Sequence, residues 1–467
     1  MVKLSMARSA FLRGLAIVYF IAFISLLPQI DGLVGANGIL PVRSFLQTVH
    51  EEYGTTAYLY FPTLAWLSSS NTVLHLLIWS GVLLSLALFV RVLPLPVTVA
   101  LYVLYLSMDT AGQVFFSFQW DALLLETGFA AILLAPMGLR PAYSDPPPRM
   151  AIWLFRFLLF RFMLESGAVK LLSGDPTWRS LTALNYHYET QPLPTPPAWY
   201  THHLPAFVQK ISVVGVFAIE LLVPFLFLGP RRVRRVAALI TIAFQLLIAF
   251  TGNYTFFNLL TIVLCFIPLF DDGQAPSPGR FRWLISAVSV VLIALGLVQL
   301  AATLGITGGL PEPVASINFG VETLHLVSRY GLFAVMTTSR PEIIIEGSDD
   351  AENWKAYEFP YKPGDVNRHL PWVAPYQPRL YWQMWFAALS NYQNNPWFAQ
   401  VLLRLLEGSP DVLKLLATNP FPDKPPRFVR ARTYDYHYTD APTRRKTGAI
   451  WTRTELGEYF PAVSLRQ

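Results

Sequence analysis

Long apolar stretches separated by short polar turns dominate the first two thirds of the chain. A helix that crosses a bilayer needs roughly 20 mostly apolar residues, and shorter runs suffice where neighbouring helices bury them. By this measure the sequence predicts about nine membrane-spanning helices. They cover residues 11–28, 72–92, 95–108, 114–136, 151–172, 211–229, 235–251, 255–270 and 282–304. Two long loops, residues 29–71 and 172–209, interrupt this series.

After about residue 305 the pattern changes to short runs that are rich in β-branched residues and bounded by turn residues. PEIIIEGSDD, WKAYEFPYKPGD and GAIWTRTELGEYFPAV are typical of strands. QMWFAALSNY and WFAQVLLRLLEG have the apolar spacing of helices, and Gly408 follows the second as a stop signal. We therefore predict a polytopic α-helical membrane region over residues 1–305 and a soluble α+β domain, rich in strands, over residues 306–467.

The composition agrees with a membrane protein. Of 467 residues, 54% are hydrophobic and only 14% are charged, and the mean hydropathy of +0.42 exceeds that of ordinary soluble domains. The single cysteine, Cys265, excludes an internal disulfide framework, a CxxC redox pair and a thiolate metal site. The net charge of +6 is spread along the chain, so we expect a lipid bilayer as partner and no nucleic acid.

The basic residues that flank the apolar runs predict the orientation in the membrane. Lys3, Arg8 and Arg13 place the N-terminus on the cytoplasmic side, because positive residues are enriched there. With nine spans, the RRVRR turn at residues 231–235 falls on the same side, and both long loops and the C-terminal domain fall on the outer side. An even number of spans would reverse the C-terminal side. The N-terminal run lacks a small-residue cleavage site, which favours an uncleaved first span.

Three predicted spans contain charged residues near mid-membrane. Arg161 and Glu165 lie four residues apart in the fifth span and therefore share one helix face. Glu126 and Glu220 lie at similar depth in the fourth and sixth spans. An unpaired charge at this depth costs at least about 2.5–3.5 kcal/mol. We therefore predict that Arg161 forms an ion pair with one or more of these carboxylates, in either a structural or a functional role.

Lys170 lies one or two turns nearer the outer face, directly before the SGDPTW turn. One explanation is a snorkelling lysine at the end of a span. The other is a general base or a substrate clamp, because an apolar pocket that desolvates the amine lowers its pKa towards neutrality. The position of Lys170 alone leaves both open.

Polar and aromatic residues gather at the predicted outer ends of the spans. We propose Lys170 as a base, assisted by His187 or Glu189, with Asp121 and Trp120 positioning a substrate. The remaining candidate binding residues are Gln119, Glu165, Asp175, Trp178, Tyr188, Gln191, His202, His203, Asn253 and Asn258. His202 and His203 are adjacent and lack the i, i+4 spacing of helical metal ligands, so we expect no metal site. The sequence leaves a cofactor undetermined.

Several blocks of this sequence resemble the signature blocks of the lipase maturation factor family. They are FQWDALLLETGFAAILLAP, SGAVKLLSGDPTWRSLTALNYHYETQPLPTPPAWYTHHLP, FTGNYTFFNLLTI and PRLYWQMWFAAL. The resemblance extends over nearly the whole chain. It implies a multispan membrane protein that assists the folding of secreted lipases. In eukaryotes such proteins reside in the endoplasmic reticulum and have a lumenal C-terminal domain.

A shorter stretch, GAVKL followed by a tryptophan, distantly resembles the transmembrane domain shared with vitamin K-dependent γ-carboxylase. In that pattern a lysine is the active-site base, so the resemblance implies this role for Lys170. Val169 stands where the carboxylase pattern has a further lysine.

Two functions of different classes follow from these observations. The first is a membrane-anchored maturation or folding factor that holds a secreted client, a lipase by resemblance, with the aromatic YWQMWFAAL segment either on its surface or in its core. The second is a membrane enzyme with a pocket in the outer leaflet and Lys170 as base. The compact, cysteine-poor loops favour a bacterial inner membrane with a periplasmic C-terminal domain, or the endoplasmic reticulum membrane if the source is eukaryotic.

Overall fold

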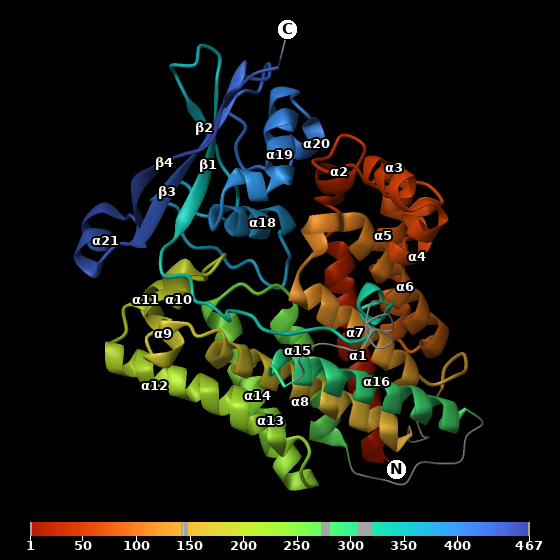
Figure 1. Ribbon diagram of the computed structural model, residues 1–467. Coiled ribbons are helices and arrows are strands. Elements are labelled where there is room, and N and C mark those ends of the chain that lie inside the picture. The colour runs from red at the N-terminus through yellow and green to blue at the C-terminus, as the bar shows by residue number, and fades with distance from the viewer. Residues whose placement is uncertain (1, 142, 144–147, 272–280, 307–319, 466–467) are drawn as a thin grey trace.

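In the computed structural model, the chain forms a helical bundle joined to a smaller domain, residues 341–465, that contains the only sheet of the described residues (Figure 1). We call it the outer domain because the sequence predicts it on the outer side of the membrane. The structure describes residues 2–141, 143, 148–271, 281–306 and 320–465. The first helix begins at the end of the bundle that lies farthest from the outer domain, and the last strand ends at the tip of that domain (Figure 1). The predicted boundary at residue 305 falls next to residues 307–319, which lie outside the described residues.

Nine helical segments of the described bundle lie where the sequence predicts spans. They are α1 (Val2–Ile24), α5 (Asn71–Phe89), α6 (Pro94–Gly112), α7 (Gln119–Leu134), α8 (Arg149–Leu172), α12 (Ala206–Phe217), α14 (Arg231–Thr251), α15 (Phe257–Phe270) and α16 (Arg282–Thr303). The sixth of these, α12, continues through a π-helical turn, η4 (Ala218–Leu222), into α13 (Val223–Leu226).

Six of these segments are long and apolar enough to cross a membrane by length and composition, within the described residues. The other three, α7, α8 and α15, do not qualify. The α7 and α15 helices have only 16 and 14 residues, and α8 has 24 residues but contains five charged side chains. The prediction of nine spans is therefore not confirmed, although the polytopic helical class is correct. One boundary also shifts, because residues 114–116 extend the third span as η3 (Gln113–Phe116) instead of opening the fourth.

Both predicted long loops contain short helices on the side of the outer domain (Figure 1). The first loop holds α2 (Ile30–Val34), α3 (Val42–Tyr53) and α4 (Ala57–Tyr60). The second holds α9 (Pro176–Arg179), α10 (Leu184–Thr190) and α11 (Pro196–His202). These helices have no more than 12 residues, so they lack the long apolar runs that predict spans.

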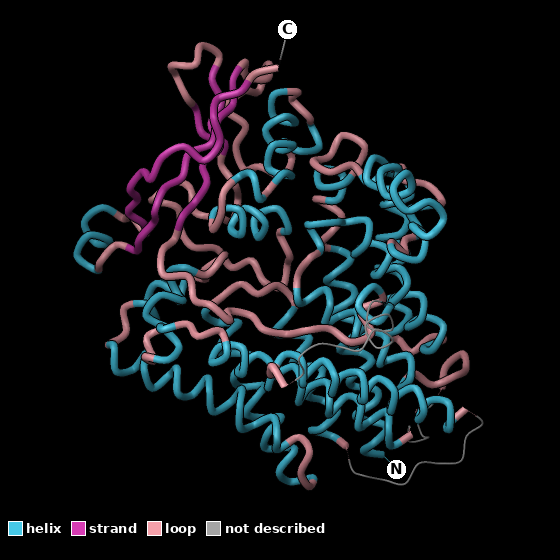
Figure 2. The backbone as a smooth tube through the Cα atoms, viewed as in Figure 1, coloured by secondary structure: helices cyan, strands magenta, loops and turns pink. Residues whose placement is uncertain are grey.

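The outer domain contains a four-stranded antiparallel sheet in the order β2-β1-β3-β4 (Figure 2). Its strands are β1 (Pro341–Ser348), β2 (Lys355–Tyr357), β3 (Phe428–Tyr438) and β4 (Trp451–Val463). The predictions of β1, β2 and β4 are confirmed, whereas β3 was missed. The helices of this domain are α18 (Arg379–Ala388), α19 (Pro396–Leu406), α20 (Pro410–Leu413) and α21 (Ala441–Thr447). The predicted stop after α19 is confirmed, with Gly408 in the left-handed region at φ +67°.

A buried ion pair joins the outer domain to the bundle. Arg379, at the start of α18, donates from Nη2 to Asp121 Oδ1 at 2.9 Å and from Nη1 to Asp121 Oδ2 at 3.0 Å. Tyr105 donates to the same carboxylate at 2.5 Å, and the carbonyl of Phe115 accepts from Arg379 at 2.8 Å. Both partners of the ion pair are fully buried. Around this ion pair, apolar side chains of the bundle and of the outer domain form one continuous core.

We predict that Arg379→Met destabilises the folded protein by about 3–5 kcal/mol, because it leaves the Asp121 carboxylate buried without its cation. The double variant Asp121→Leu with Arg379→Met should recover most of this loss, since both charges are then removed. The thermal unfolding midpoint of the purified full chain in detergent measures the effect. Equal midpoints for the single and double variants would contradict the assigned role of the ion pair.

Candidate functional site

Six of the predicted site residues hold one extended segment, residues 320–340, which we call the strap. The strap runs across the bundle between its helices and the outer domain and ends at β1 (Figure 1). The six are Gln119, Glu126, Arg161, Glu165, Asp175 and Trp178. The charges inside the spans therefore bind main-chain groups of the strap as well as one another.

Glu126 is the centre of this arrangement. One carboxylate oxygen accepts from the Arg161 guanidinium. The other accepts from the Tyr330 hydroxyl at 2.7 Å and from the Ser328 amide at 2.9 Å. Glu165 accepts from the Tyr330 amide at 3.1 Å and lies 3.7 Å from Arg161. Because an isolated carboxylate is expensive in an apolar bundle, these donors explain how Glu126 is tolerated there.

The rest of the strap is held by polar side chains nearer the end of the bundle that carries the outer domain. Gln119 accepts from the Gly331 amide at 3.0 Å. The Trp178 indole donates to the Phe333 carbonyl at 2.9 Å, and Asp175 accepts from the Met336 amide at 2.7 Å. Burial alone would raise the pKa of Asp175, but hydrogen bonds from Thr177 and the Met336 amide outweigh it and hold the pKa below its usual range.

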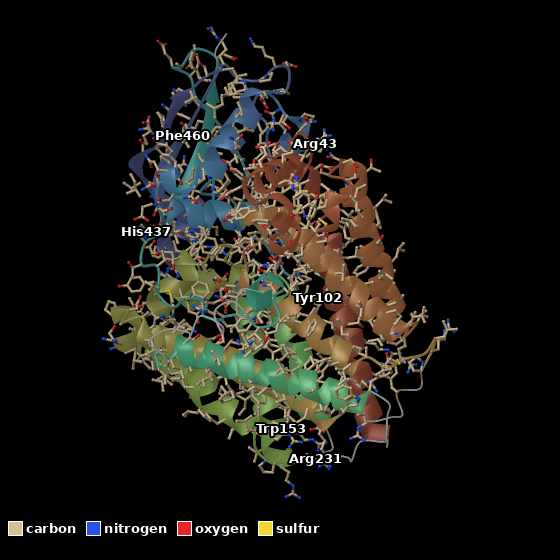
Figure 3. All side chains as sticks on the ribbon, turned by 45° about the vertical axis from the view of Figure 1, so that its right-hand side comes forward. Arg43, Tyr102, Trp153, Arg231, His437 and Phe460 are labelled. Carbon is tan, nitrogen blue, oxygen red and sulfur yellow. The ribbon has the colours of Figure 1, made fainter. Side chains whose placement is uncertain are left out.

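A second set of predicted residues binds the outer domain itself. Asn253 accepts from the amides of Val373 and Ala374 at 2.8 and 2.9 Å. Glu189 accepts from the Tyr438 amide at 2.6 Å and lies 3.3 Å from His437, which is placed beside the bundle at the lower edge of the outer domain in Figure 3. These groups dock the outer domain on the bundle.

His437 titrates at this junction. Burial alone would lower the pKa of His437, but the carboxylates of Glu189 and Asp435 outweigh it and raise the pKa above its usual value. The stabilisation from this histidine is therefore present below its unfolded-state pKa and is lost as the pH rises through the folded-state pKa.

Gln191 supports the same junction from the second loop. Its side chain donates to the Thr251 carbonyl at 2.8 Å and accepts from the Tyr254 hydroxyl at 3.0 Å. Its own carbonyl accepts from Arg340 at 2.5 Å, and Arg340 also donates to the carbonyls of Glu189 and Pro192. The fully buried Arg340 thus fixes the second loop against β1.

His202, His203 and Trp120 have packing roles. The His202 ring lies 5.3 Å from that of Tyr438, and the His203 ring lies 4.2 Å from that of Trp199. Trp120 stacks on Phe118 at 4.6 Å. Burial lowers the pKa of His202 below its usual value. Among the described residues, no group of three or more histidine, cysteine or acidic side chains is placed to hold a metal ion.

The remaining predicted residues line a cavity of about 280 Å³ between α8, α12, η4, α14 and α15. Lys170, His187, Tyr188 and Asn258 belong to its wall, together with Glu220 and Trp178. Phe162, Met163, Ile219, Phe244, Ile248, Phe257, Leu332 and Phe333 form much of its apolar surface. The cavity is therefore an apolar chamber with a polar end, which is the usual composition of a small-molecule site.

Lys170 is neither a snorkelling lysine nor a free amine. It is buried, and its ammonium donates to Glu220 Oε2 at 2.7 Å and to the Ser166 carbonyl at 2.9 Å. It also lies 5.4 Å from the centre of the Trp178 ring. Glu220 therefore pairs with Lys170, whereas Arg161 pairs with Glu126 and Glu165, which confirms the prediction of one or more carboxylate partners for Arg161. Gly167 permits the contact between Lys170 and Glu220, because a Cβ there would lie 2.8 Å from Glu220 Cβ.

His187 and Asn258 complete the polar end of the cavity. The Tyr254 hydroxyl lies 3.2 Å from His187 Nε2. Burial, reinforced by the charge of Lys170, lowers the pKa of His187 to about 4, so the ring is neutral at pH 7. Asn258 donates to Gln245 Oε1 at 2.8 Å. Asp121 is not part of this wall, so the proposed group of Lys170, His187 and Asp121 is not assembled.

Sequence reasoning missed several residues of these networks. Tyr330, Arg340 and Arg379 are the buried partners of the predicted polar groups, and Tyr254 lies between His187 and Gln191. Arg340 and Arg379 stand outside the apolar runs, where a charge is not unusual, and no periodic pattern surrounds Tyr330. Two quoted blocks contained a signal: GNYTFFN includes Tyr254 beside the predicted Asn253, and PRLYWQMWFAAL includes Arg379.

The whole length of the chain matches proteins of one kind. Residues 6–276 match the lipase maturation factor transmembrane domain, and residues 326–461 match the lipase maturation factor C-terminal domain. The chain belongs to the lipase maturation factor family. The expected resemblance is thereby confirmed, and so is the assignment as an integral membrane protein with several apolar spans.

Among characterised members of the lipase maturation factor family, lipase maturation factor 2 of Homo sapiens is 37% identical over an alignment that covers 98% of this chain and 82% of that protein. Lipase maturation factor 2 of Gallus gallus is 36% identical, with 98% and 81% covered. Lipase maturation factor 1 of Bos taurus is 36% identical, with 98% and 89% covered. No solved structure matches the chain.

We predict opposite effects for two Gly→Ala substitutions in helices of this site. Gly167→Ala should destabilise the protein by about 1–3 kcal/mol, because its Cβ collides with Glu220 and Leu221 across the α8–η4 contact. Gly215→Ala in α12 meets no atom within 4 Å and should stabilise the helix by up to about 1 kcal/mol. Unfolding midpoints of the two purified variants test this pair, and a stable Gly167→Ala protein would refute the close packing.

Proposed function

We propose that this protein is a membrane-anchored maturation factor that binds secreted lipases on its outer face while they fold. The observation that carries the proposal is membership of the lipase maturation factor family across both the transmembrane region and the C-terminal domain. The relatives named above carry this function in their names. The joined core of bundle and outer domain supports it further, since a rigid platform is suited to holding a client.

The client site that we propose is an aromatic groove of about 310 Å³ beside the strap, under α18. Trp120 and Trp382 line it with ring centres 4.6 Å apart, and their buried indole N–H groups have no partner among the described residues. Phe386, Leu389 and Val335 also line it and are 44%, 41% and 66% exposed. The exposed apolar side chains at the rim of this groove fit an extended apolar segment of an unfolded lipase.

The alternative of a membrane enzyme with Lys170 as base has less support. The lysine is held in an ion pair with Glu220, and a base needs an amine lone pair that is free to accept a proton. The aromatic YWQMWFAAL segment, in turn, is mostly core. Tyr381, Trp382 and Trp385 are buried, and Phe386 is the large aromatic side chain of this segment that faces outwards. The groove therefore offers a client an edge of this segment and not its whole surface.

Point substitutions test the groove better than removal of the whole domain, since deletion would also strip Glu126, Asp121 and Glu189 of their partners. We predict that Phe386→Ser combined with Leu389→Ser lowers the yield of active secreted lipase about tenfold, as expected when apolar anchors worth more than 1 kcal/mol are removed. The assay is secreted lipase activity per lipase molecule in cells that lack their own lipase maturation factor and co-express the variant.

The matched control for this assay is Leu456→Ser, which removes a side chain that is 60% exposed on β4 and outside the groove. It should retain full lipase maturation at equal membrane levels. Full activity of the Phe386→Ser, Leu389→Ser protein would refute the groove as the client site. If Leu456→Ser also lost lipase maturation, the loss would not be specific to the groove, and this too would contradict the groove as the client site.

We also propose that the N-terminus and the RRVRR turn lie on the cytoplasmic side and the outer domain on the opposite side, periplasmic in a bacterium and lumenal in the endoplasmic reticulum. In support, Arg231 lies at the far end of the bundle from Phe460 (Figure 3). The enrichment of basic residues at that end favours the same orientation.

Cysteine labelling tests this orientation, because Cys265 is the single native cysteine and is buried. In intact spheroplasts or right-side-out vesicles, a membrane-impermeant maleimide should modify Lys446→Cys in the outer domain. It should modify Arg232→Cys only after the membrane is permeabilised. Both positions are exposed, so the reverse pattern would overturn the orientation without ambiguity.

A further inference from the structure

We propose that the cavity around Lys170 and Glu220 binds a single acyl chain from the membrane, with the carbonyl or carboxyl group of the chain at the polar end of the cavity. This inference concerns a ligand site that is separate from the proposed client groove, and it does not depend on lipase maturation. The argument rests on the walls, the mouth and the hydrogen-bond donors of the cavity.

The mouth of the cavity lies between two helices that present apolar surface outwards. Leu247 of α14 lines the cavity and is 60% exposed, while Gly215 of α12 lines it and has no atom within 4 Å of the position of a Cβ. Next to them, Val214 and Leu246 are 52% and 57% exposed. Since α12 and α14 belong to candidate membrane spans, these side chains face the acyl chains of the bilayer. The cavity is thus open to lipid between α12 and α14.

The interior walls suit a hydrocarbon chain. Phe162 of α8 and Phe257 of α15, which are 3% and 6% exposed, line the cavity as buried residues. Most of the other lining side chains are apolar or aromatic, and the lining area is predominantly apolar. Transfer of a chain from one apolar medium to another is inexpensive, so the selectivity for a particular ligand must come from the polar end.

The polar end offers donors and little net charge. Lys170 uses two of its three N–H groups on Glu220 and Ser166, and the ion pair with Glu220 neutralises its charge. Gln245 accepts from Asn258 through its oxygen, which leaves its NH₂ group without a partner among the described residues. His187 Nδ1 is also buried and unpartnered there. It is the acceptor of the neutral ring, because the Tyr254 hydroxyl donates to Gln191 and so receives the proton of His187 Nε2. The free N–H groups of Lys170 and Gln245 fit a carbonyl or carboxyl oxygen, and His187 Nδ1 can accept from the O–H of a carboxyl group. An electrically balanced pocket with these donors does not fit a cationic head group.

The test uses the full chain in nanodiscs whose phosphatidylcholine contains a photoreactive diazirine in one acyl chain. After irradiation, mass spectrometry should find lipid adducts on Phe162 or Phe257 as well as on the exposed Phe207, which is 65% exposed on the outside of α12. In Gly215→Phe, the new ring fills the open position at the mouth, so the interior adducts should be lost while the Phe207 adduct remains. Leu247→Trp provides a second block from α14 if Gly215→Phe fails to fold.

Adducts confined to exposed positions, or interior adducts that both blocking variants leave unchanged, would overturn the proposal. A parallel sample contains unreactive phospholipid and a photoreactive free fatty acid. It distinguishes an acyl chain that belongs to a phospholipid from one that belongs to a free fatty acid. Interior adducts with the phospholipid alone identify an ester-linked chain, and interior adducts with the free acid alone identify a fatty acid. Either result supports the acyl site. Normal lipase maturation by Gly215→Phe would leave the proposed function intact, so the two proposals fail independently.

Discussion

The folded state depends most on the set of donors around the Glu126 carboxylate. A charge in the centre of an apolar bundle is tolerated only if it is paired and its remaining acceptor sites are satisfied. Arg161 supplies the pairing from α8, and the strap supplies the Tyr330 hydroxyl and the Ser328 amide. The cost of burying this carboxylate therefore fixes the strap in one place. Everything that the strap carries, including Phe333 and the start of β1, is positioned as a result.

The sequence predicts the elements of the fold better than their contacts. Apolar runs locate the helices of the bundle, and alternation locates three of the four strands. The hydrogen-bond partner of a buried polar group is harder to predict from the sequence, because the two can lie far apart in the chain. Glu126 and Tyr330, for example, are 204 residues apart. Arg161 pairs with Glu126 and Glu165, as predicted, but the sequence did not indicate that Glu220 pairs with Lys170. A π-helical turn carries Glu220, and such a turn changes the helix face on which a side chain lies, so depth in the span was a poor guide to its partner.

Two cavities share one wall in this molecule. Tyr254, Leu332 and Phe333 line both the chamber near Lys170 and the aromatic groove under α18. The Tyr254 ring lies 5.8 Å from that of Phe333 and 6.0 Å from that of Trp382. In close-packed protein, a side chain in a shared wall cannot move without changing the space on both sides. The membrane-facing chamber and the outer groove are therefore mechanically linked through three side chains.

The place of the strap in the chain also has a consequence for biosynthesis. Residues 320–340 emerge from the ribosome long after α7 and α8, yet they satisfy the carboxylates of both helices. Until then Glu126 can pair with Arg161, but the acceptor sites of its carboxylate that later bind Tyr330 and Ser328 have no donor from the strap. The bundle therefore stays incomplete until about 70% of the chain has been translated, and the binding of the strap completes it. The protein thus completes the core of its bundle with one of its own late-made segments.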